Sequence, residues 1–346
     1  MRPAFTTPAL VMGAIAVLGL ASCESGFDRN DQIVNSLRIL GAAAHIDSGD
    51  GVDWADAQVG DTVTLSALVA NPTGIPSVTV HWVTCLPSNN VTPCTSEAVL
   101  RQPADLIPMA ADPTSGVILL GVGETIQYVI PQAVQPLLDM LIASADNSLN
   151  AQCSVYKQAP VIIIAQGSDG SVVTALKNLR LSPWSMTGPG AADARLQHYI
   201  RNANPSITAL NIPGDKSACI GQTLVASCQS DADCGGATCS SDGWCPPSPF
   251  PAGSQTICGQ IPDADIQTYY YCGMDGVDGS EVEYPTITWY ATGGVQATIS
   301  NANTAGTPDL ASRTFELYTR PPGPFTLYGV VRDGRDGENW IAQAFP

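Results

Sequence analysis

Charged side chains are scarce in this chain. Asp, Glu, Lys and Arg make up 13% of its 346 residues, against roughly 25% in an ordinary soluble domain. Lysine is especially rare, and the acidic excess gives a formal net charge of −17. A surface this acidic makes nucleic acid and bare anionic membrane poor partners.

Catalytic side chains are scarce too. The three histidines, His45, His81 and His198, are not spaced as metal ligands, and no Gly-x-Ser-x-Gly nucleophile motif occurs. His81 alternates with the buried positions of its strand, so we expect it on a solvated face. The sequence therefore predicts a protein that is not an enzyme, and a hydrolase is the least favoured reading.

Gly and Pro are abundant, with 32 and 27 positions. A turn-rich, charge-poor composition argues against coiled coils and helical bundles and favours many short strands. The 45% hydrophobic content excludes a disordered chain. The length suggests two or three domains.

Long hydrophobic runs are also lacking. The apolar stretch at 9–20 is too short to span a bilayer. It ends in Leu20-Ala21-Ser22-Cys23, which resembles the lipobox of bacterial lipoproteins. The resemblance implies a signal peptide at 1–22, lipid attachment at Cys23 and a membrane anchor of acyl chains. The alternative is an ordinary secretory signal. Glu24 resembles the sorting position that permits outer-membrane delivery, with the leaflet left open.

Export would place the remaining ten cysteines in an oxidising compartment, where an even number of cysteines predicts five disulfides. No C-x-x-C pair supports a zinc ribbon or a redox site. The cysteines are Cys85, Cys94, Cys153, Cys219, Cys228, Cys234, Cys239, Cys245, Cys258 and Cys272.

Alternating apolar residues predict strands in both halves of the chain. The clearest segments are 61–70, 78–82, 160–165, 172–175, 206–212, 286–289, 325–331 and 340–342. Each half carries a strand with a Trp, Trp82 or Trp289, and a late Asp-Gly hairpin. This pattern resembles the immunoglobulin-like sandwich. We expect an all-β fold of two tandem immunoglobulin-like β-sandwiches.

The domain boundaries follow from composition. We expect a tether at 23–36, a first domain at 37–182, a linker at 183–204 and a second domain at 205–346. The first domain should carry a helical insertion near 134–144, where one apolar stripe packs over an edge of the sandwich or, alternatively, binds a partner. The stripe consists of Val134, Leu137, Leu138, Leu141 and Ile142.

A disulfide-rich insertion at 228–272 is expected in the second domain. Its run Cys228-x5-Cys234-x4-Cys239-x5-Cys245 resembles a small Cys-rich knuckle of secreted proteins and myxobacterial-type lipoproteins. The resemblance implies the pairs Cys228–Cys239 and Cys234–Cys245. Each expected domain holds an odd number of cysteines, so full oxidation requires a link between domains. We predict Cys153 as its first-domain member.

Acidic turns and a group of aromatic residues are the remaining candidate sites. Turns at 47–53, 275–281 and 333–338 cluster carboxylates, and calcium prefers oxygen ligands. Asp275, Asp278 and Glu281 are the best calcium candidates, but none of the turns fits an EF-hand and a turn without metal is favoured. No other cofactor is expected. Tyr269, Tyr271 and Trp244 are candidates for an aromatic binding patch, with ordinary packing as the alternative.

Together these features predict a lipid-anchored cell-envelope protein, of outer-membrane type, without catalytic activity. It would act as a binding or scaffolding subunit of a surface assembly or in adhesion, with envelope proteins or surface glycans as partners. The alternative is a glycan- or peptidoglycan-binding lipoprotein.

Overall fold

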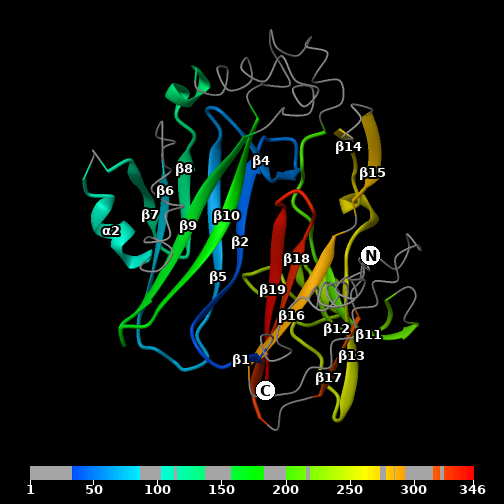
Figure 1. The fold of residues 1–346 in the computed structure, drawn as a ribbon. Helices are drawn as coiled ribbons and strands as arrows, with labels where there is room; N and C mark the ends of the chain where they lie inside the picture. Colours follow the sequence, from blue (N-terminus) through cyan, green and yellow to red (C-terminus); the bar gives the residue numbers. More distant parts are fainter. Residues whose placement is uncertain are drawn as a thin grey trace, which may run out of the picture.

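Five β-sheets make up most of the described part of the chain (Figure 1). The computed structural model describes residues 33–85, 103–112, 115–136, 157–182, 200–215, 219–272, 278–283, 285–292, 315–319 and 323–346. Within these residues, no helix has both the length and the apolar character that a membrane crossing requires.

The first sandwich consists of a four-stranded sheet in the order β3-β2-β5-β8 and a five-stranded sheet in the order β4-β10-β9-β6-β7. All pairs are antiparallel except β4 with β10. The strands are β2 Arg38–Asp47, β3 Asp53–Trp54, β4 Asp56–Gln58, β5 Thr62–Ala70, β6 Val78–Cys85, β7 Val117–Val122, β8 Thr125–Val129, β9 Lys157–Gly167 and β10 Val172–Ser182.

The alternation in β5 explains how this sandwich buries its core. Val63, Leu65 and Ala67 point inward, because successive strand residues face opposite sides. Trp82 of β6 is fully buried among them, and its indole Nε1 donates to the Gly123 carbonyl at 2.8 Å. The Trp is therefore both a core residue and a link to the turn between β7 and β8.

Short helical segments accompany the first sandwich. They are η3 Pro103–Asp105, α2 Leu106–Met109 and η4 Gln132–Val134. Leu106 packs with Val83, Ile162 and Ile164 on the outer face of the five-stranded sheet. Residues 135–136 are helical, and the rest of the helix expected near 134–144 lies outside the described residues.

The cover on this outer face corrects the expectation for His81. The side chain is half-buried instead of solvated, and burial lowers its pKa, opposed by a hydrogen bond with Gln166. Strand alternation assigns a residue to a face of the sheet, but it does not show whether another segment covers that face.

The second sandwich consists of sheets in the orders β1-β16-β18-β19 and β12-β11-β13-β17, with a separate β14-β15 hairpin. Short 3₁₀ turns, η8 Asp231–Cys234 and η9 Asp263–Asp265, lie between its strands. The strands are β1 Ile33–Val34, β11 Ala209–Asp215, β12 Ile220–Ala226, β13 Ser254–Gln260, β14 Thr268–Cys272, β15 Asp278–Val282, β16 Thr286–Thr292, β17 Phe315–Thr319, β18 Phe325–Arg332 and β19 Glu338–Phe345.

Aromatic residues fill the second core. Trp289 lies over Gly329, where an added Cβ would approach the indole to 2.6 Å. Phe250, Phe325 and Phe345 form a cluster at one end of this core, with ring centroids 5.3–5.4 Å apart. Such edge and stacked contacts are favourable beyond their buried area. A core containing a Trp is thus present in each sandwich.

The expected boundaries differ from the structure at two places. Ile33 and Val34, expected in the tether, form β1 and pair in parallel with β16 of the second sandwich. In the expected linker, Asn202 and Asn204 are buried and bonded between the sandwiches. Pairing and packing of these short segments depend on residues far away in the sequence, so local composition did not indicate them.

Candidate functional site at the domain junction

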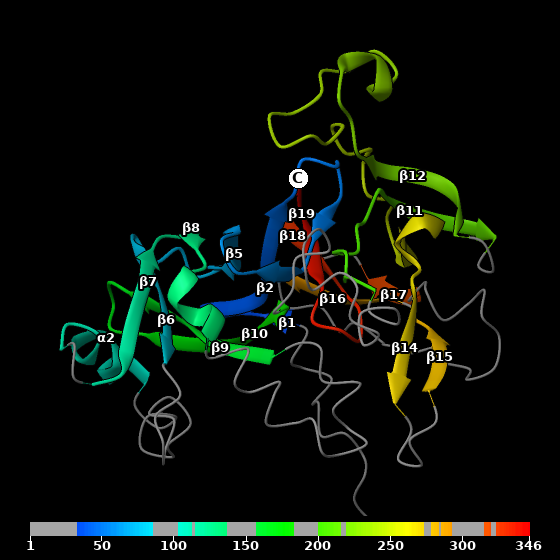
Figure 2. The same ribbon diagram turned by 90° about the horizontal axis from the view of Figure 1, so that it is seen from above.

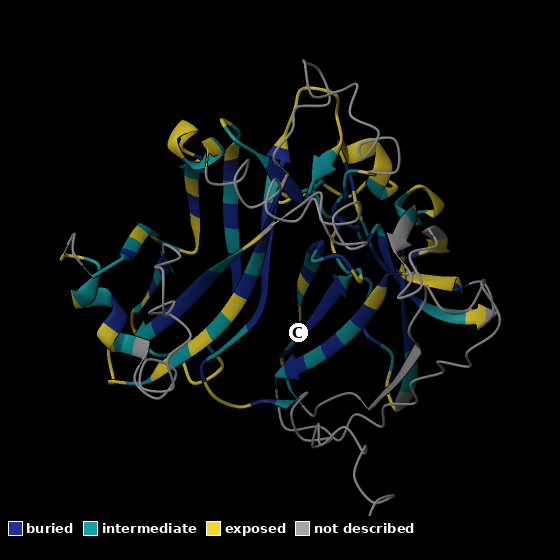
Figure 3. Ribbon diagram, turned by 45° about the horizontal axis from the view of Figure 1, so that its top comes forward, coloured by how far each residue is buried: buried dark blue, intermediate teal, exposed yellow. Residues whose placement is uncertain are grey.

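The turn between β18 and β19, residues 333–337, lies between the two sandwiches. Asp333 Oδ1 accepts hydrogen bonds from the backbone N–H groups of Arg335 and Gly337, at 2.8 and 2.7 Å. Aspartate favours tight turns because its side chain can bond the backbone in this way. Buried residues line the strands of both sandwiches where they meet (Figure 3).

Arg335 is buried at the centre of this junction. Its Nε lies 2.7 Å from Glu283 Oε2. Its Nη1 donates to the Ile200 carbonyl at 3.0 Å, and its Nη2 to Gln267 Oε1 at 2.5 Å. The guanidinium carbon is 5.0 Å from the ring centroid of Tyr269, a cation–π distance. One side chain therefore joins the turn, the linker end and the β14-β15 region.

The backbone of Arg335 is held from the first sandwich. Arg180 Nη1 and Asn202 Nδ2 both donate to its carbonyl at 3.1 Å. Arg180 Nε lies 3.2 Å from Asp56 Oδ1, and the Asn202 backbone N–H donates to Asp56 Oδ2 at 3.1 Å. Asp56 is completely buried, so its negative charge requires these partners.

A second group of charges lies beside the first. Lys177 of β10 donates through Nζ to the Asp336 carbonyl, and the same Nζ is 4.0 Å from Glu338 Oε2. Glu338 Oε1 lies 2.8 Å from Arg332 Nη2, which also donates to the Leu40 carbonyl at 2.7 Å. These contacts join β10 and β2 of the first sandwich to β18 and β19 of the second.

Burial shifts the titration of the acidic and basic groups at the junction. Burial raises the pKa of Glu283, the charge of Asp333 raises it further, and Arg335 opposes both. Burial also raises the pKa of Glu338 and lowers the pKa of Lys177. Each charge is costly to bury, and its partners make it tolerable. The junction therefore depends on correct pairing across it.

An apolar contact completes the junction. Val34, Leu40, Leu68 and Ala70 pack against Tyr328 and Val330 of the second sandwich. Gly41 marks the closest approach, because an added Cβ would lie 2.9 Å from Glu338 Oε1 and 3.3 Å from Val330. On the side of β5 opposite the first core, the C-terminal residues Leu68 and Ala70 are thus buried as well, against a different domain.

The acidic turn at 47–53 forms a surface cluster near the end of the linker. Asp50 accepts a hydrogen bond from Trp54 Nε1, with N–O distances of 3.1 and 3.2 Å, and Asp53 Oδ2 lies 2.7 Å from His45 Nδ1. The guanidinium of Arg201 is 5.0 Å from the Trp54 ring centroid. These carboxylates bind protein donors.

Of the three calcium candidates, Glu281 is the one whose side chain is described. Glu281 accepts a hydrogen bond from the Tyr269 hydroxyl at 3.1 Å. Asp275 lies outside the described residues, and the side chain of Asp278 is outside the described part. The one described carboxylate of the three thus has a protein partner.

The structure also places two of the aromatic candidates. Tyr269 is half-buried against Arg335, and Trp244 is half-buried and packs against the second core. Packing, the alternative reading, therefore describes both side chains. The side chain of Tyr271 lies outside the described part.

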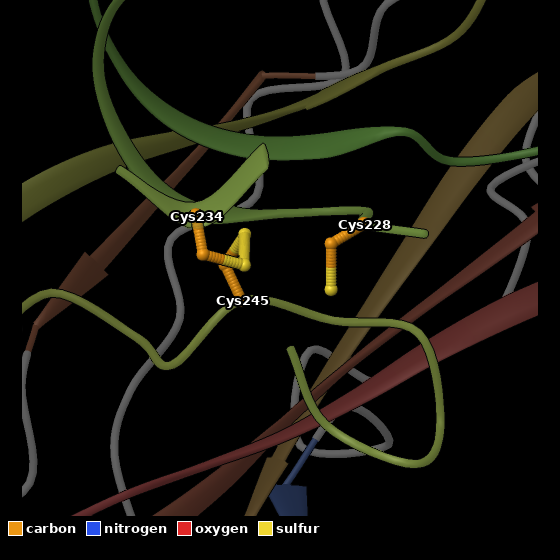
Figure 4. A group of neighbouring side chains, drawn as sticks. All are labelled: Cys228, Cys234 and Cys245. Carbon is orange, nitrogen blue, oxygen red and sulfur yellow. A yellow bond between two sulfur atoms is a disulfide. The ribbon is translucent and has the colours of Figure 1, made fainter. Parts of the chain in front are cut away.

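The Cys-rich knuckle projects away from both sandwiches (Figure 2). It contains disulfides Cys228–Cys239 and Cys234–Cys245, the pairings that the resemblance implies. The sulfur atoms of Cys228, Cys234 and Cys245 lie within 4.8 Å of one another (Figure 4). Because metals bind thiolates and these sulfurs are oxidised, the group is a pair of adjacent disulfides and not a metal centre.

A further disulfide, Cys219–Cys258, joins the start of β12 to β13. Cys85 is also disulfide-bonded. Cys23, Cys94 and Cys153 lie outside the described residues, and Cys272 is described through its backbone in β14. The predicted link between domains therefore stays a prediction.

The junction can fix two domains relative to each other, and its groups bond one another instead of facing a substrate site. Sequence reasoning noted the turn at 333–338 but missed Arg335, Arg180 and Lys177, whose burial comes from domain docking. The available signal was their rarity: isolated basic residues in a charge-poor chain need acidic partners when they are buried.

No protein-family model matches the chain, and no curated protein sequence matches it. The similar solved structures include fibronectin(III)-like modules of Clostridium thermocellum CbhA, with 10% identity, a TM-score of 0.20 and coverage of 87% of this chain and 92% of that one. Bacteroides ovatus SGBP-B in complex with a mixed-linkage heptasaccharide has 11% identity and a TM-score of 0.19, and the match covers 90% of this chain and 70% of that one. The C-terminal domain of Streptococcus pyogenes AspA has 10% identity and a TM-score of 0.19, and the match covers 88% of this chain and 99% of that one. Similarity this low carries no argument about function.

Proposed function

We propose that this chain is a lipid-anchored cell-envelope protein that acts as a rigid, non-catalytic binding or scaffolding subunit of a surface assembly or in adhesion. It would be attached through Cys23 and consist of two immunoglobulin-like sandwiches. The observation that carries the proposal is the buried junction around Arg335. Arg180 and Lys177 of the first sandwich donate there to the Arg335 and Asp336 carbonyls, and Lys177 pairs with Glu338 of the second.

Rigidity is what such a role requires. Two domains joined by a flexible linker lose conformational freedom when both engage a partner, whereas a preformed arrangement avoids that cost. Buried Lys177 of the first sandwich bonds to the Asp336 carbonyl and lies 4.0 Å from Glu338 of the second, so displacement of one sandwich would leave buried charges unpaired. The loops and outer edges of the sandwiches then remain available for contacts.

The glycan-binding alternative has less support from the described residues. Sugar binding favours an aromatic ring with a free face. One face of Tyr269 contacts Arg335, and Trp244 contributes to the second core. We therefore favour a protein partner.

The test is crosslinked co-purification of the tagged full-length lipoprotein from membranes, with Cys23→Ser as the unanchored control. The proposal expects a protein partner in constant stoichiometry with the anchored form. Retention of the protein on purified cell wall or polysaccharide, without any such partner, would overturn it in favour of glycan binding. Mass spectrometry of the mature N-terminus tests the anchor itself: acyl chains on Cys23 are expected, and an unmodified N-terminus contradicts that part.

A further inference from the structure

The two ends of the molecule can be defined from strand register. Ile33 and Val34 of β1 lie beside the last residues of β16, and Phe325 pairs with Phe345 at that same end of the sheet. After three intervening residues the chain enters β2, whose first residue, Arg38, pairs with Ala70. We call this the anchor end, because the predicted lipid-bearing segment joins the fold here.

Several turns lie at the anchor end. The segment at 71–77 follows Ala70, and the turn at 168–171 lies beside it, since the Ser168 backbone N–H donates to the Ser77 carbonyl. The segment at 249–253 carries Phe250, which contacts Phe325 and Phe345. Figure 1 shows β1 and the C-terminus at the bottom of the molecule, with β4 and the β14-β15 hairpin at the top.

Charge separates the two ends. Among the described residues 35–37, 71–77, 168–171, 249–253 and 323–324, Asp169 is the single charged side chain. At the opposite end, which we call the far end, lie the turns at 47–53 and 263–267 and the β14-β15 hairpin. Its carboxylates outnumber its basic groups; they belong to Asp47, Asp50, Asp53, Asp61, Asp263, Asp265 and Glu281.

Chain length limits how the fold can meet a membrane. Ten residue steps separate Cys23 from Ile33, and a fully extended chain covers about 33–36 Å over that distance. The tether alone therefore permits several tilts of the molecule. Charge selects among them, because the negative potential of an anionic leaflet repels carboxylates within about a Debye length of its surface.

We propose that the anchor end is a membrane-facing surface, and that the acidic far end points away from it. The described turns of the anchor end can approach an anionic bilayer because Asp169 is their single charged side chain. This inference rests on the proposed function, because it takes the N-terminus as the point of attachment. It resolves how a chain of net charge −17 can stay close to an anionic surface: among the described residues, the contact is made by turns that carry a single carboxylate, that of Asp169.

The experiment measures energy transfer to bilayer surfaces. The full lipoprotein is reconstituted in vesicles of phosphatidylethanolamine and phosphatidylglycerol that contain a headgroup-labelled acceptor lipid. A donor is placed through a non-canonical amino acid, which leaves the disulfides intact, at Thr73 of the anchor end or at Val52 of the far end. Both positions are exposed turn residues of the first sandwich, and β2 separates their ends by about 33 Å.

We expect several-fold more efficient transfer from position 73 than from position 52, and a smaller difference in vesicles without phosphatidylglycerol. Equal transfer from both positions, or stronger transfer from 52, would overturn the inference. A mature chain with a histidine tag in place of Cys23, bound to nickel-chelating lipid, repeats the measurement without native acylation. The native protein could fail to bind vesicles while the tagged chain still shows stronger transfer from position 73 than from position 52. That result would refute the lipid anchor but not the orientation.

Discussion

Arg335 and Glu283 form a buried ion pair, with Arg335 Nε 2.7 Å from Glu283 Oε2. The arginine belongs to the turn after β18, and the glutamate precedes β16. The carbonyl of the same arginine accepts hydrogen bonds from Arg180 of the first sandwich and from Asn202. This pair therefore couples the order of the second sandwich to its docking against the first.

Replacing Arg335 tests that coupling. Arg335→Met keeps much of the side-chain volume but leaves Glu283 buried without its cation, and we expect the free energy of unfolding to fall by about 3–5 kcal/mol. Urea denaturation with the disulfides intact measures the loss. Gln158→Ala removes an exposed hydrogen bond to Asp336 of the same turn and should cost about 1 kcal/mol or less. Equal losses in the two variants would contradict the central place of Arg335.

The raised pKa of Glu283 predicts a pH dependence of stability. Between its ordinary value of 4.5 and the raised folded value, the folded protein keeps a proton that the unfolded chain has lost. The contribution of this group to stability therefore falls as pH rises through that window. Each tenfold difference in acidity between the two states corresponds to about 1.4 kcal/mol.

The variant Glu283→Gln removes this titration. Its stability relative to wild type should increase as pH rises above 4.5, as urea midpoints across the acidic to neutral range would show. Glu281→Gln, which removes an exposed carboxylate nearby, is the control for loss of a glutamate charge in this region. Parallel curves for wild type and Glu283→Gln would refute the prediction.

Gly41 is expected to be intolerant of a larger side chain. Gly41→Val places atoms against Glu338 and Val330, where even a Cβ would be 2.9–3.3 Å from neighbouring atoms. Overpacking of this kind costs about 1–3 kcal/mol. Gly323→Ala, where an added Cβ meets no atom within 4 Å, is the matched control. Thermal unfolding of the two variants compares them, and an unchanged midpoint for Gly41→Val would show that the junction is loosely packed.

The described disulfides leave one second-domain cysteine for the predicted link between domains. Six of the seven cysteines of the second domain are paired with one another, which leaves Cys272. If all ten cysteines are oxidised, Cys272 must join the first domain, and we predict Cys153 as its partner. Peptide mapping without reduction should yield a 153–272 linked peptide. Cys272 recovered as a free thiol would contradict full oxidation.

Local sequence patterns predicted the strands well and the junction poorly. The alternation of Val63, Leu65 and Ala67 indicated one buried face of β5, and that face lines the first core. The opposite face includes Leu68 and Ala70, which pack in one cluster with Tyr328 of the second sandwich. The alternation of apolar residues along a strand indicates which face is buried between the two sheets of one sandwich. Docking between domains depends on complementary surfaces whose residues lie far apart in the sequence.

The candidate site shows the same limit. Asp333-Gly334 and Asp336-Gly337 indicated a tight turn, because Asp and Gly favour turn geometry, and the turn is present. The sequence could not show that the turn would be buried, since the groups that cover it come from β10, the linker and β15–β16. Asp56 and Arg180 are likewise far apart in sequence and become partners through the parallel pairing of β4 and β10.

The buried junction should hold the two sandwiches together as one rigid body. Spin labels at Thr174 of β10 and Ile220 of β12, both exposed, allow the distance between the sandwiches to be measured by pulsed electron paramagnetic resonance. We predict a single narrow distribution of the distance between the two labels in the wild-type protein and a broad distribution in Arg335→Met. A broad or multiple distribution in the wild-type protein would contradict the claim.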